Sequence, residues 1–596
     1  MQTELVSLVT LTIDDREVTA PAGTSVLEAG NQAGVRIPHL CSDPRLAPTG
    51  ACRLCVVEID GEHGLQAACT RQVAPGMVVH ADTEATHASR RSTLEMLLSE
   101  HRVACTTCDM DGGCLLQDYA YEYQASETSL PNIALPAGCD NYASKSAAIA
   151  YDPSKCVRCQ LCIRFCDEIQ MAEALTLRGR SGQVEVTTGF DIELDASTCE
   201  LCGGCVNICP TGALYDRGAK GLGRPGDLLK VRTTCAYCGV GCQIELNVNR
   251  RLNRVVRVTS EPGCLPNDGN LCVKGKYAFD FIHAPERLTT PQIRENGALR
   301  DASWEEAIRV AADGLAAARD THGPEGIAFL SSARCTNEEN YLMQKLARMA
   351  GKTNNVDQCA TTCHAPTVAG LASAFGSGAM TNAISEIENV QTIFLIGANP
   401  TEAHPVVGLE MKKALRKGAR LIVCDPRETW MARRADIHIK HRPGTDNMLI
   451  NAMMKHLVDQ GLYDRAFVES RCEQYEAFRE NLAKYPVERA AEFGNTPRLL
   501  PSLPEKAARA LEHVLRRSGP CQANDTFFLA TDALAQWCLQ SVEAGCPPWP
   551  LLQCIADPEE FRRRVDELRA SREMRNDDVS LLVVELHDGL APAIRL

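Results

Sequence analysis

Alternating hydrophobic and polar positions open the chain. Residues 8–13 and 17–20 each alternate in the manner of a half-buried strand, and a turn at 21–24 leads into an expected helix over 25–33. Ser25 can cap that helix, because Glu28 follows three residues later at the spacing of a capping box. The pattern therefore predicts a β-hairpin followed by one short helix.

Further elements follow at wider spacing. Residues 85–100 predict a second helix, and residues 121–150 predict a linker because they carry several Pro and Gly residues. After a glycine-rich linker at 218–226, strand-like segments at 243–247 and 255–258 predict a small β-subdomain.

From about residue 300 the pattern alternates between helices and apolar runs. The expected helices cover 304–319, 338–350 and 402–417, and the apolar runs cover 326–330, 392–396 and 420–423. Such alternation predicts an α/β domain with a mostly parallel sheet. Two of the runs end in polar turns that contain Gly397 and Asp425. Because ligands of open α/β sheets bind at the carboxyl ends of strands, these turns are candidate sites for a nucleotide-like cofactor.

Composition narrows the class of protein. A chain of 596 residues is too long for one hydrophobic core, so several domains are expected. Its 45% hydrophobic and 23% charged residues are ordinary for a globular protein, and a net charge of −14 argues against a nucleic-acid partner. No apolar run of about 18 residues predicts a membrane span, and no signal peptide is recognisable. We therefore expect a cytoplasmic protein.

Thirty cysteines are the unusual feature. In a large chain without a signal peptide, reduced thiols that bind metals are favoured over disulfides. Nineteen of the thirty fall into five spaced sets, which decides the interpretation in favour of metal ligands.

The first set follows the predicted helix at spacings of ten, two and thirteen residues. It consists of Cys41, Cys52, Cys55 and Cys69. Four thiolates are the ligands of a [2Fe–2S] cluster, and Gly50 allows the backbone to fold closely over it. The alternative is a zinc site, although zinc sites more often show two separated pairs of cysteines. The set resembles the plant-type ferredoxin module of complex-I-like subunits, which implies a β-grasp domain.

The second set combines one histidine with three cysteines. It consists of His101, Cys105, Cys108 and Cys114. The set resembles the His-ligated [4Fe–4S] site of the same subunit family. In isolation His101 would be read as a surface or core residue, and its position just before three cysteines favours the ligand interpretation.

An internal repeat supplies the third and fourth sets. Cys156, Cys159, Cys162 and Cys166 recur at the same spacing as Cys199, Cys202, Cys205 and Cys209. This spacing is that of bacterial two-cluster ferredoxins, in which the fourth cysteine of each run binds the other cluster. One [4Fe–4S] cluster is therefore assigned to Cys156, Cys159, Cys162 and Cys209, and the other to Cys199, Cys202, Cys205 and Cys166.

The fifth set surrounds the predicted β-subdomain. Cys235, Cys238 and Cys242 lie close together in the chain, and Cys272 follows after a long interval. Lys274 comes two residues after Cys272. Four cysteines again predict a [4Fe–4S] cluster.

These motifs together resemble a known family. The residues that carry the resemblance are the fifth set with residues 271–275, residues 354–357, 363–370 and 376–382, and the turns at Gly397 and Asp425. They are similar to the molybdenum/tungsten bis-pterin oxidoreductases and, within them, to the NAD-linked formate dehydrogenase alpha subunits. The resemblance covers roughly residues 1–490.

The resemblance implies a multidomain α/β and α+β architecture with truncated molybdopterin-oxidoreductase α/β domains. The expected parts are a β-grasp [2Fe–2S] domain (1–80), a [4Fe–4S] segment with one histidine and three cysteine ligands (81–120), a two-[4Fe–4S] ferredoxin domain (145–217), a [4Fe–4S] molybdopterin-oxidoreductase domain (228–284), a molybdopterin-binding α/β domain (285–494) and a C-terminal fragment (495–596).

It also implies catalytic roles. Cys363 would ligate the metal, with Cys359 as a rival ligand, and His364 would assist proton movement. Lys274 would lie between cluster and pterin, although a solvated surface lysine is the alternative. Gly397, Asn399, Asp425 and Arg427 are the implied cofactor-binding residues, since backbone amides and an Arg fork suit phosphate and a carboxylate suits a guanine edge.

The implied reaction is formate oxidation to carbon dioxide. The implied cofactors of the chain are one [2Fe–2S] cluster, four [4Fe–4S] clusters and a Mo- or W-bis-molybdopterin guanine dinucleotide. Electrons would travel towards NAD through a flavin/NAD-binding diaphorase-type partner subunit. The alternative is a non-catalytic iron–sulfur electron-transfer subunit like that of the complex I peripheral arm.

The last hundred residues break the pattern. Residues 525–535 and 575–582 resemble the last metal-binding motifs of bacterial type 2C protein phosphatases, with Asp532 and Asp578 as the implied metal ligands. The amino-terminal half of such a phosphatase is not recognisable, and two carboxylates alone do not make a two-metal site. A signalling phosphatase is therefore the third and weakest hypothesis, and the tail is interpreted as a phosphatase-like fragment.

Overall fold

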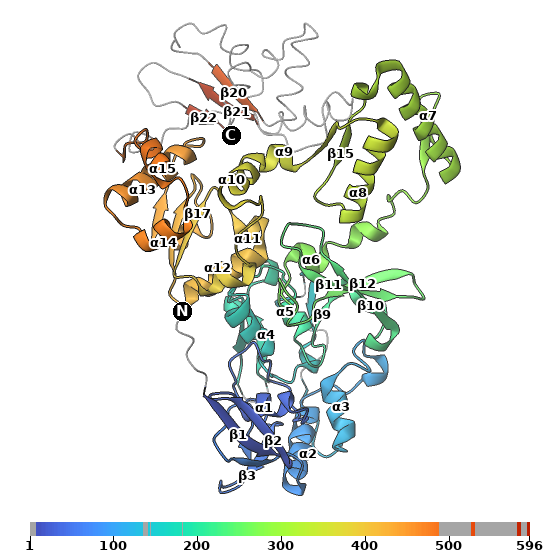
Figure 1. The fold of residues 1–596 in the computed structure, drawn as a ribbon. Coiled ribbons are helices and arrows are strands. Elements are labelled where there is room, and N and C mark those ends of the chain that lie inside the picture. The colour runs from blue at the N-terminus through green and yellow to red at the C-terminus, as the bar shows by residue number, and fades with distance from the viewer. Residues whose placement is uncertain are drawn as a thin grey trace. The chain divides into compact units, whose positions relative to one another are not determined.

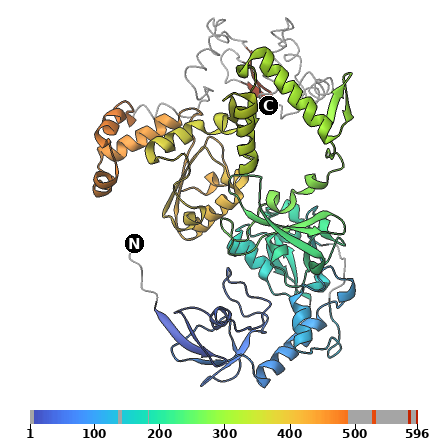
Figure 2. The same cartoon turned by 45° about the vertical axis from the view of Figure 1, so that its right-hand side comes forward.

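The computed structural model describes residues 7–134, 141–143, 145–180 and 183–487, together with the backbone of three short strands nearer the C-terminus. The chain divides into two compact units, residues 1–441 and 442–596. Asp532 and Asp578, on which the phosphatase resemblance depends, lie outside the described residues. Figure 1 labels many of the elements named below, and Figure 2 shows the same ribbon turned by 45°.

A five-stranded mixed sheet forms the first part of the larger unit, in the order β2-β1-β5-β3-β4. Its elements are β1 (Leu8–Ile13), β2 (Arg16–Pro21), α1 (Val26–Gln32), β3 (Val56–Ile59), β4 (Gln66–Ala67) and β5 (Val78–His80). The predicted hairpin is present, with β1 and β2 antiparallel. The predicted capping box is present as well, because Ser25 and Glu28 bond each other's backbone N–H groups.

Two helices follow the sheet. They are α2 (Glu84–Ser99) and α3 (Leu115–Glu122). Arg90 of α2 is 2% exposed and donates to the backbone carbonyls of Leu54 and Val56, which flank Cys55. Helix α2 is thereby bonded to the strand region that carries part of the first cysteine set.

The ferredoxin-like part is built from short elements around the repeated cysteines. They are β6 (Ile149–Tyr151), α4 (Leu161–Arg164), β7 (Leu175–Arg178), β8 (Glu185–Thr188), α5 (Gly204–Asn207) and β9 (Leu214–Asp216). Tyr142 and Ala143 pack into its buried cluster. The end of the expected linker at 121–150 therefore belongs to a folded core, because Tyr142 buries an aromatic ring there.

A three-stranded antiparallel sheet carries the fifth cysteine set. It consists of β10 (Leu228–Thr234), β11 (Gln243–Asn249) and β12 (Arg254–Thr259), and α6 (Val273–Tyr277) follows it. Strand β10 has no predicted counterpart. Its side chains are largely exposed, so the sequence gives it no clear hydrophobic alternation.

The α/β region begins after a hairpin of β13 (Gln292–Glu295) and β14 (Ala298–Asp301). Its elements are α7 (Trp304–His322), β15 (Phe329–Ser331), α8 (Asn337–Leu346), β16 (Val356–Gln358), α9 (Ala360–Cys363), α10 (Ala365–Phe375), β17 (Thr392–Ile396), α11 (Pro400–Ala403), α12 (Pro405–Arg416), β18 (Arg420–Cys424) and β19 (Ile437–Ile439). The strands pair in parallel, as predicted, but they form two separate sheets, β15-β16 and β17-β18-β19.

One predicted helix is divided. The expectation of a single helix over 402–417 is wrong, because α11 ends at Ala403 and α12 begins at Pro405. His404 between them has a non-helical backbone, with φ −138° and ψ 67°. Proline disfavours helical backbone in the residue before it and lacks the N–H that a continuous helix needs, which explains the break.

The smaller unit contains α13 (Asp446–Asp459), α14 (Arg465–Arg471) and α15 (Tyr475–Leu482) among its described residues. The backbone of an antiparallel sheet, β20-β21-β22, is also described, at Thr526–Ala530, Leu581–Glu585 and Ala593–Arg595.

Candidate functional site

The four cysteines of the first set meet beside the five-stranded sheet. All four are buried. The backbone N–H of Cys52 donates to Cys41 Sγ at 3.3 Å, and the Cys52 thiol lowers the pKa of Cys41 to about 5. The Cys55 thiol likewise lowers the pKa of Cys69 to about 7. Each pair therefore favours one thiolate, which is the form that binds iron.

The second set lines one small cavity, which His101 shares with Cys105, Cys108 and Cys114. The His101 ring is 7% exposed, and its Nδ1 lies 3.1 Å from the backbone carbonyl of Lys155. A hydrogen bond at Nδ1 fixes the neutral tautomer with a free Nε2, which is how metal-binding histidines are usually oriented. Burial lowers the pKa of His101 and so also favours the neutral ring.

The two ferredoxin-like runs exchange their fourth cysteines in space. Burial raises the pKa of Cys159, and the neighbouring Cys209 thiolate raises it further. Burial raises the pKa of Cys202 to about 12, with added contributions from Cys199 and Cys166. Cys209 thus lies with the first run and Cys166 with the second, which is the arrangement that the two-cluster pattern predicts.

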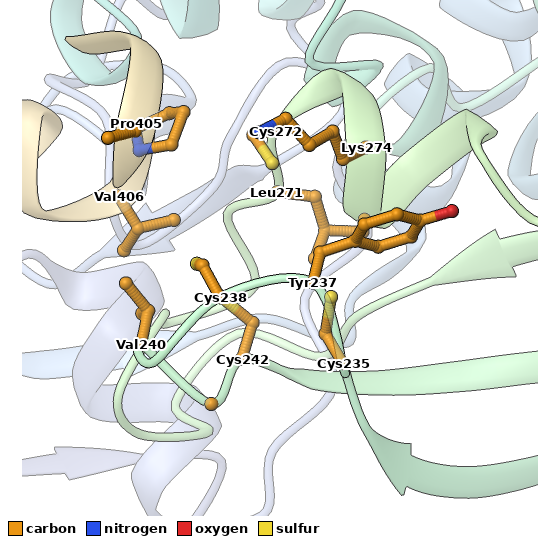
Figure 3. Close-up of a pocket in the computed structure, with 13 residues that line it drawn as sticks. Cys235, Tyr237, Cys238, Val240, Cys242, Leu271, Cys272, Lys274, Pro405 and Val406 are labelled. Atoms are coloured by element: carbon orange, nitrogen blue, oxygen red, sulfur yellow. The ribbon is translucent and has the colours of Figure 1, made fainter. Parts of the chain in front are cut away.

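The fifth set lines one cavity, shown in Figure 3. Burial raises the pKa of Cys242 to about 12, and the thiolates of Cys235, Cys238 and Cys272 contribute to the rise. Cys272 is the N-cap residue of α6, so its thiol and the first turn of that helix lie together. Four converging thiols match the donor set of a [4Fe–4S] cluster.

Lys274 lines this same cavity, and so do Pro405 and Val406 of α12 (Figure 3). The opposite wall of the cavity is therefore made by the α/β region. The spacing of the cysteines predicts the four thiols, whereas nothing in their spacing predicts the contribution of α12. The sequence places Lys274 only near Cys272, and the structure places it on the cavity wall.

The proposed metal-site residues are differently placed. Cys363 ends α9 and is exposed, and His364 stands between α9 and α10. Cys359 precedes α9 and is also exposed. The described residues that line the cavity of the fifth set do not include any of these three. Cys363 is thus exposed to solvent, and it does not share the cavity that Lys274 lines.

The proposed cofactor-cradle residues do meet at one edge of a sheet. β17 and β18 are parallel neighbours, so Gly397 and Asp425, which directly follow them, lie together, and the N–H of Gly397 donates to the Cys424 carbonyl at 2.9 Å. Gly397 has φ +58°, a conformation that glycine adopts easily. The Arg427 guanidinium and backbone N–H both donate to the buried Asp425 carboxylate. Asn399 precedes α11 and accepts from the Thr401 hydroxyl at 2.9 Å.

Two cations, the buried Arg164 and the half-buried Lys155, join the cysteine sets, and sequence reasoning missed them. Arg164 donates to the Cys41 carbonyl at 3.1 Å, and Lys155 Nζ lies 3.6 Å from Cys108 Sγ. Both cations belong to the ferredoxin-like part, so it contacts the first and second sets directly. The only sequence signal was that Lys155 and Arg164 stand beside or between cysteines of the third set.

Two features are absent from the described part of the chain. No group of three or more His, Cys, Asp or Glu residues there is arranged to hold a single metal ion. No helix there combines the length and apolar character needed to cross a bilayer.

Family comparisons match five regions in chain order. The matched descriptions are a 2Fe-2S iron-sulfur cluster binding domain (7–84), an NADH-ubiquinone oxidoreductase-G iron-sulfur binding region (90–129), an NADH-quinone oxidoreductase subunit 3 ferredoxin-like domain (146–215), a molybdopterin oxidoreductase Fe4S4 domain (229–284) and a molybdopterin oxidoreductase (287–542). The chain carries molybdopterin oxidoreductase and iron–sulfur domains. These oxidoreductase domains support a molybdopterin cofactor, a 2Fe-2S centre and 4Fe-4S centres. The molybdopterin match extends beyond residue 494, where the resemblance was expected to end.

Curated relatives are similar over most of this chain. A Bacillus subtilis protein named "Probable oxidoreductase YjgC" is 32% identical over 523 residues, which is 81% of this chain and 52% of that protein. A Staphylococcus aureus protein named "Putative formate dehydrogenase" is 30% identical over 536 residues, covering 82% of this chain and 53% of that protein. The chain therefore spans about half the length of these relatives.

Solved structures are similar over smaller parts. An NAD+-reducing [NiFe]-hydrogenase structure has 32% identity and a TM-score of 0.33, covering 37% of this chain and 91% of that chain. Acetylene hydratase from Pelobacter acetylenicus has 22% identity and a TM-score of 0.38, covering 44% of this chain and 36% of that chain.

Proposed function

We propose that this chain acts as the catalytic subunit of a formate dehydrogenase. Formate would be converted to carbon dioxide, one proton and two electrons at a molybdenum or tungsten ion held by bis-molybdopterin guanine dinucleotide. The matched oxidoreductase domains support the redox class, and relatives named as formate dehydrogenases support the substrate. When bound, the metal–pterin group would take up the two electrons and the iron–sulfur clusters would store and relay them.

The cavity of the fifth set is the observation that carries the proposal. Four thiols line it together with Lys274, and residues Pro405 and Val406 close it from the α/β region. Lys274 is exposed, so water screens its charge, and a cation on this wall favours extra negative charge inside the cavity by a modest amount. Lys274 would therefore favour electron entry at the boundary between the Fe4S4 match and the molybdopterin match.

Residues of the α/β region would hold and serve the cofactor. We infer that Cys363 supplies a thiolate ligand and that His364 accepts the proton released from formate. Gly397 and Asn399 would offer backbone and amide donors to phosphate, and Asp425 with Arg427 would bind the guanine and phosphate ends. The shared sheet edge of β17 and β18 supports this grouping.

The other cysteine sets would carry electrons away from the fifth. We infer that the ferredoxin-like part holds two [4Fe–4S] clusters, the His101 set a third and the Cys41 set a [2Fe–2S] cluster. Lys155 contacts Cys108 and Arg164 contacts Cys41, so both outer sets have a direct connection to the ferredoxin-like part. A flavin/NAD-binding diaphorase-type subunit would then accept the electrons.

A non-catalytic electron-transfer subunit is the second candidate. The exposure of Cys363 favours it, as does the absence of buried side chains among the described residues of α10. In that case the cysteine sets would still bind clusters, but formate would not reduce them.

Anaerobic reduction separates the two candidates. The purified, cofactor-loaded chain is treated with formate and then with dithionite, and the bleaching of the cluster absorbance is compared, together with Mo, W and Fe content. A catalytic subunit bleaches with formate, and a non-catalytic subunit bleaches with dithionite alone.

Matched cysteine variants locate the metal ligand. We expect Cys363→Ala to abolish bleaching by formate and to leave bleaching by dithionite intact. Cys359→Ala, the control, should keep both. Equal formate bleaching in wild type and Cys363→Ala would overturn the site assignment, and loss in Cys359→Ala alone would move it to the rival cysteine.

A further inference from the structure

Lys276 lies at the C-terminal end of α6 and is among the largest fully buried side chains described in the chain. Its side chain is 1% exposed, and its ammonium donates to Asp216 Oδ2 at 2.9 Å, to Asn207 Oδ1 at 2.9 Å and to the Val258 carbonyl at 2.7 Å. An ammonium group has three donors, so all of them are satisfied. A lysine that is buried this completely, with one carboxylate partner, is rare enough to require an explanation.

The acceptors of Lys276 come from two different parts of the molecule. Asn207 and Asp216 belong to the ferredoxin-like part, and Val258 belongs to the sheet that carries the fifth cysteine set. Asn207 stands between Cys205 and Cys209 in the chain. The cation is thus placed where the fourth and fifth cysteine sets approach each other.

Gly203 shows how closely α6 approaches the fourth set. Gly203 follows Cys202 and has φ +70°, and a Cβ added there would lie 2.6 Å from Lys276 Cε and 2.9 Å from the Tyr277 hydroxyl oxygen. Burial raises the pKa of Tyr277, and the nearby Asp216, Cys205 and Cys202 raise it further. The end of α6 therefore packs directly on the loop between Cys202 and Cys205.

Helix α6 connects the two sets over one short element. Its N-cap residue is Cys272 of the fifth set, and its last two residues, Lys276 and Tyr277, contact the loop of the fourth set. A helix of five residues rises only about 7 Å. Any electron that passes between the two sets would thus pass close to the buried ammonium.

We propose that Lys276 sets the electron affinity of the cluster bound by Cys166, Cys199, Cys202 and Cys205, through the buried charge pair that it forms with Asp216. The inference rests on the proposed cluster ligands and is independent of formate. A nearby positive charge stabilises the reduced, more negative cluster, and Asp216 opposes that effect. Lys276 acts here as a positioning residue for electron transfer, since it does not ligate iron.

Redox titration of the full, anaerobically reconstituted chain tests the proposal. Dithionite and mediators set the potential, and electron paramagnetic resonance follows each cluster; the signal lost in Cys202→Ala identifies the relevant one. We expect Lys276→Met to weaken electron uptake about tenfold, which is about 59 mV lower for a one-electron couple. Asp216→Asn should shift the same signal in the opposite direction.

Three further variants separate charge from packing. The double variant Lys276→Met/Asp216→Asn should return towards the wild-type potential, and Lys276→Arg should keep it, because the charge is retained. Lys220 follows Asp216 by four positions in the chain but is exposed, so Lys220→Met should leave every signal in place.

Two results would overturn the proposal. One is an unchanged potential in Lys276→Met at full iron content, and the other is a shift in the same direction for Lys276→Met and Asp216→Asn, as a purely structural role would give. If Lys276→Met loses iron, Asp216→Asn and Lys276→Arg decide: a raised potential in Asp216→Asn with an unchanged potential in Lys276→Arg supports the proposal, and an unchanged potential in Asp216→Asn overturns it. If Cys202→Ala loses none of the cluster signals that the wild-type chain shows, the ligand assignment is wrong, and this inference fails with it.

Discussion

Arg90 is the residue on which the first module should depend most strongly. Its guanidinium is 2% exposed and donates to the carbonyls of Leu54 and Val56 at 3.2 and 2.9 Å and to the Tyr123 hydroxyl at 3.2 Å. The two carbonyls flank Cys55, one of the inferred [2Fe–2S] ligands. Substitution of Arg90 by Met keeps an unbranched apolar stem but removes every donor.

The expected cost follows from the groups left behind. Two buried carbonyls lose their side-chain partner, and each unsatisfied acceptor costs about 1–3 kcal/mol. Because the buried methionine recovers part of this loss, we expect Arg90→Met to lower the free energy of unfolding of this module by about 3 kcal/mol. With a urea dependence of about 2 kcal/mol per molar, the unfolding midpoint would fall by about 1.5 M.

Visible circular dichroism of the [2Fe–2S] centre gives a local readout of this module in the full chain during urea unfolding. Arg36→Met serves as the control, since Arg36 is 65% exposed and pairs with Glu122 only at the surface. Exposed ion pairs contribute at most about 1 kcal/mol, so the control midpoint should stay near wild type. Equal midpoints for Arg90→Met and Arg36→Met would refute the reasoning.

Two further predictions concern the fourth cysteine set and the β18 turn. A Cβ on Gly204 would lie 1.9 Å from the buried Phe165 ring, so Gly204→Ala should lose one [4Fe–4S] cluster, about four iron atoms per chain. Gly239 has open space around it, so the control Gly239→Ala should keep its iron. Equal iron content of the two variants in iron and sulfide assays would contradict this. Burial alone would raise the pKa of Asp425, but hydrogen bonds from Arg427 hold that pKa below the ordinary value of 3.8. The carboxylate therefore stabilises the fold above pH 3.8. This stabilisation is lost as the pH falls through the lower pKa of the folded state. In thermal unfolding of the cluster-free chain, the advantage of wild type over Asp425→Asn should therefore shrink below about pH 4, and a constant advantage from neutral to acidic pH would argue against the Arg427 contact.

Local patterns in the sequence predicted the elements that depend on neighbouring residues. The hairpin at the start and the Ser25 capping box were predicted from periodicity and spacing, which are visible in a single chain segment. The exchange of Cys166 and Cys209 was predicted from the resemblance of the two runs to bacterial two-cluster ferredoxins.

Features that depend on contacts between distant segments could not be predicted in this way. The Lys276 ammonium bonds residues 60 and 69 positions away, and Val406 reaches the cavity of the fifth set from another region. Strand β10 was not predicted, because its side chains are largely exposed and show no alternation of hydrophobic and polar residues. His404 is different, since Pro405 was a visible signal for the helix break.

Iron stoichiometry of the anaerobically reconstituted full chain, counted together with the reduced centres in electron paramagnetic resonance, tests the central claim most directly. One [2Fe–2S] and four [4Fe–4S] clusters predict about 18 iron atoms per chain and five reducible centres. A chain that binds zinc at the cysteine sets, or that holds only a few iron atoms after reconstitution, would contradict the account.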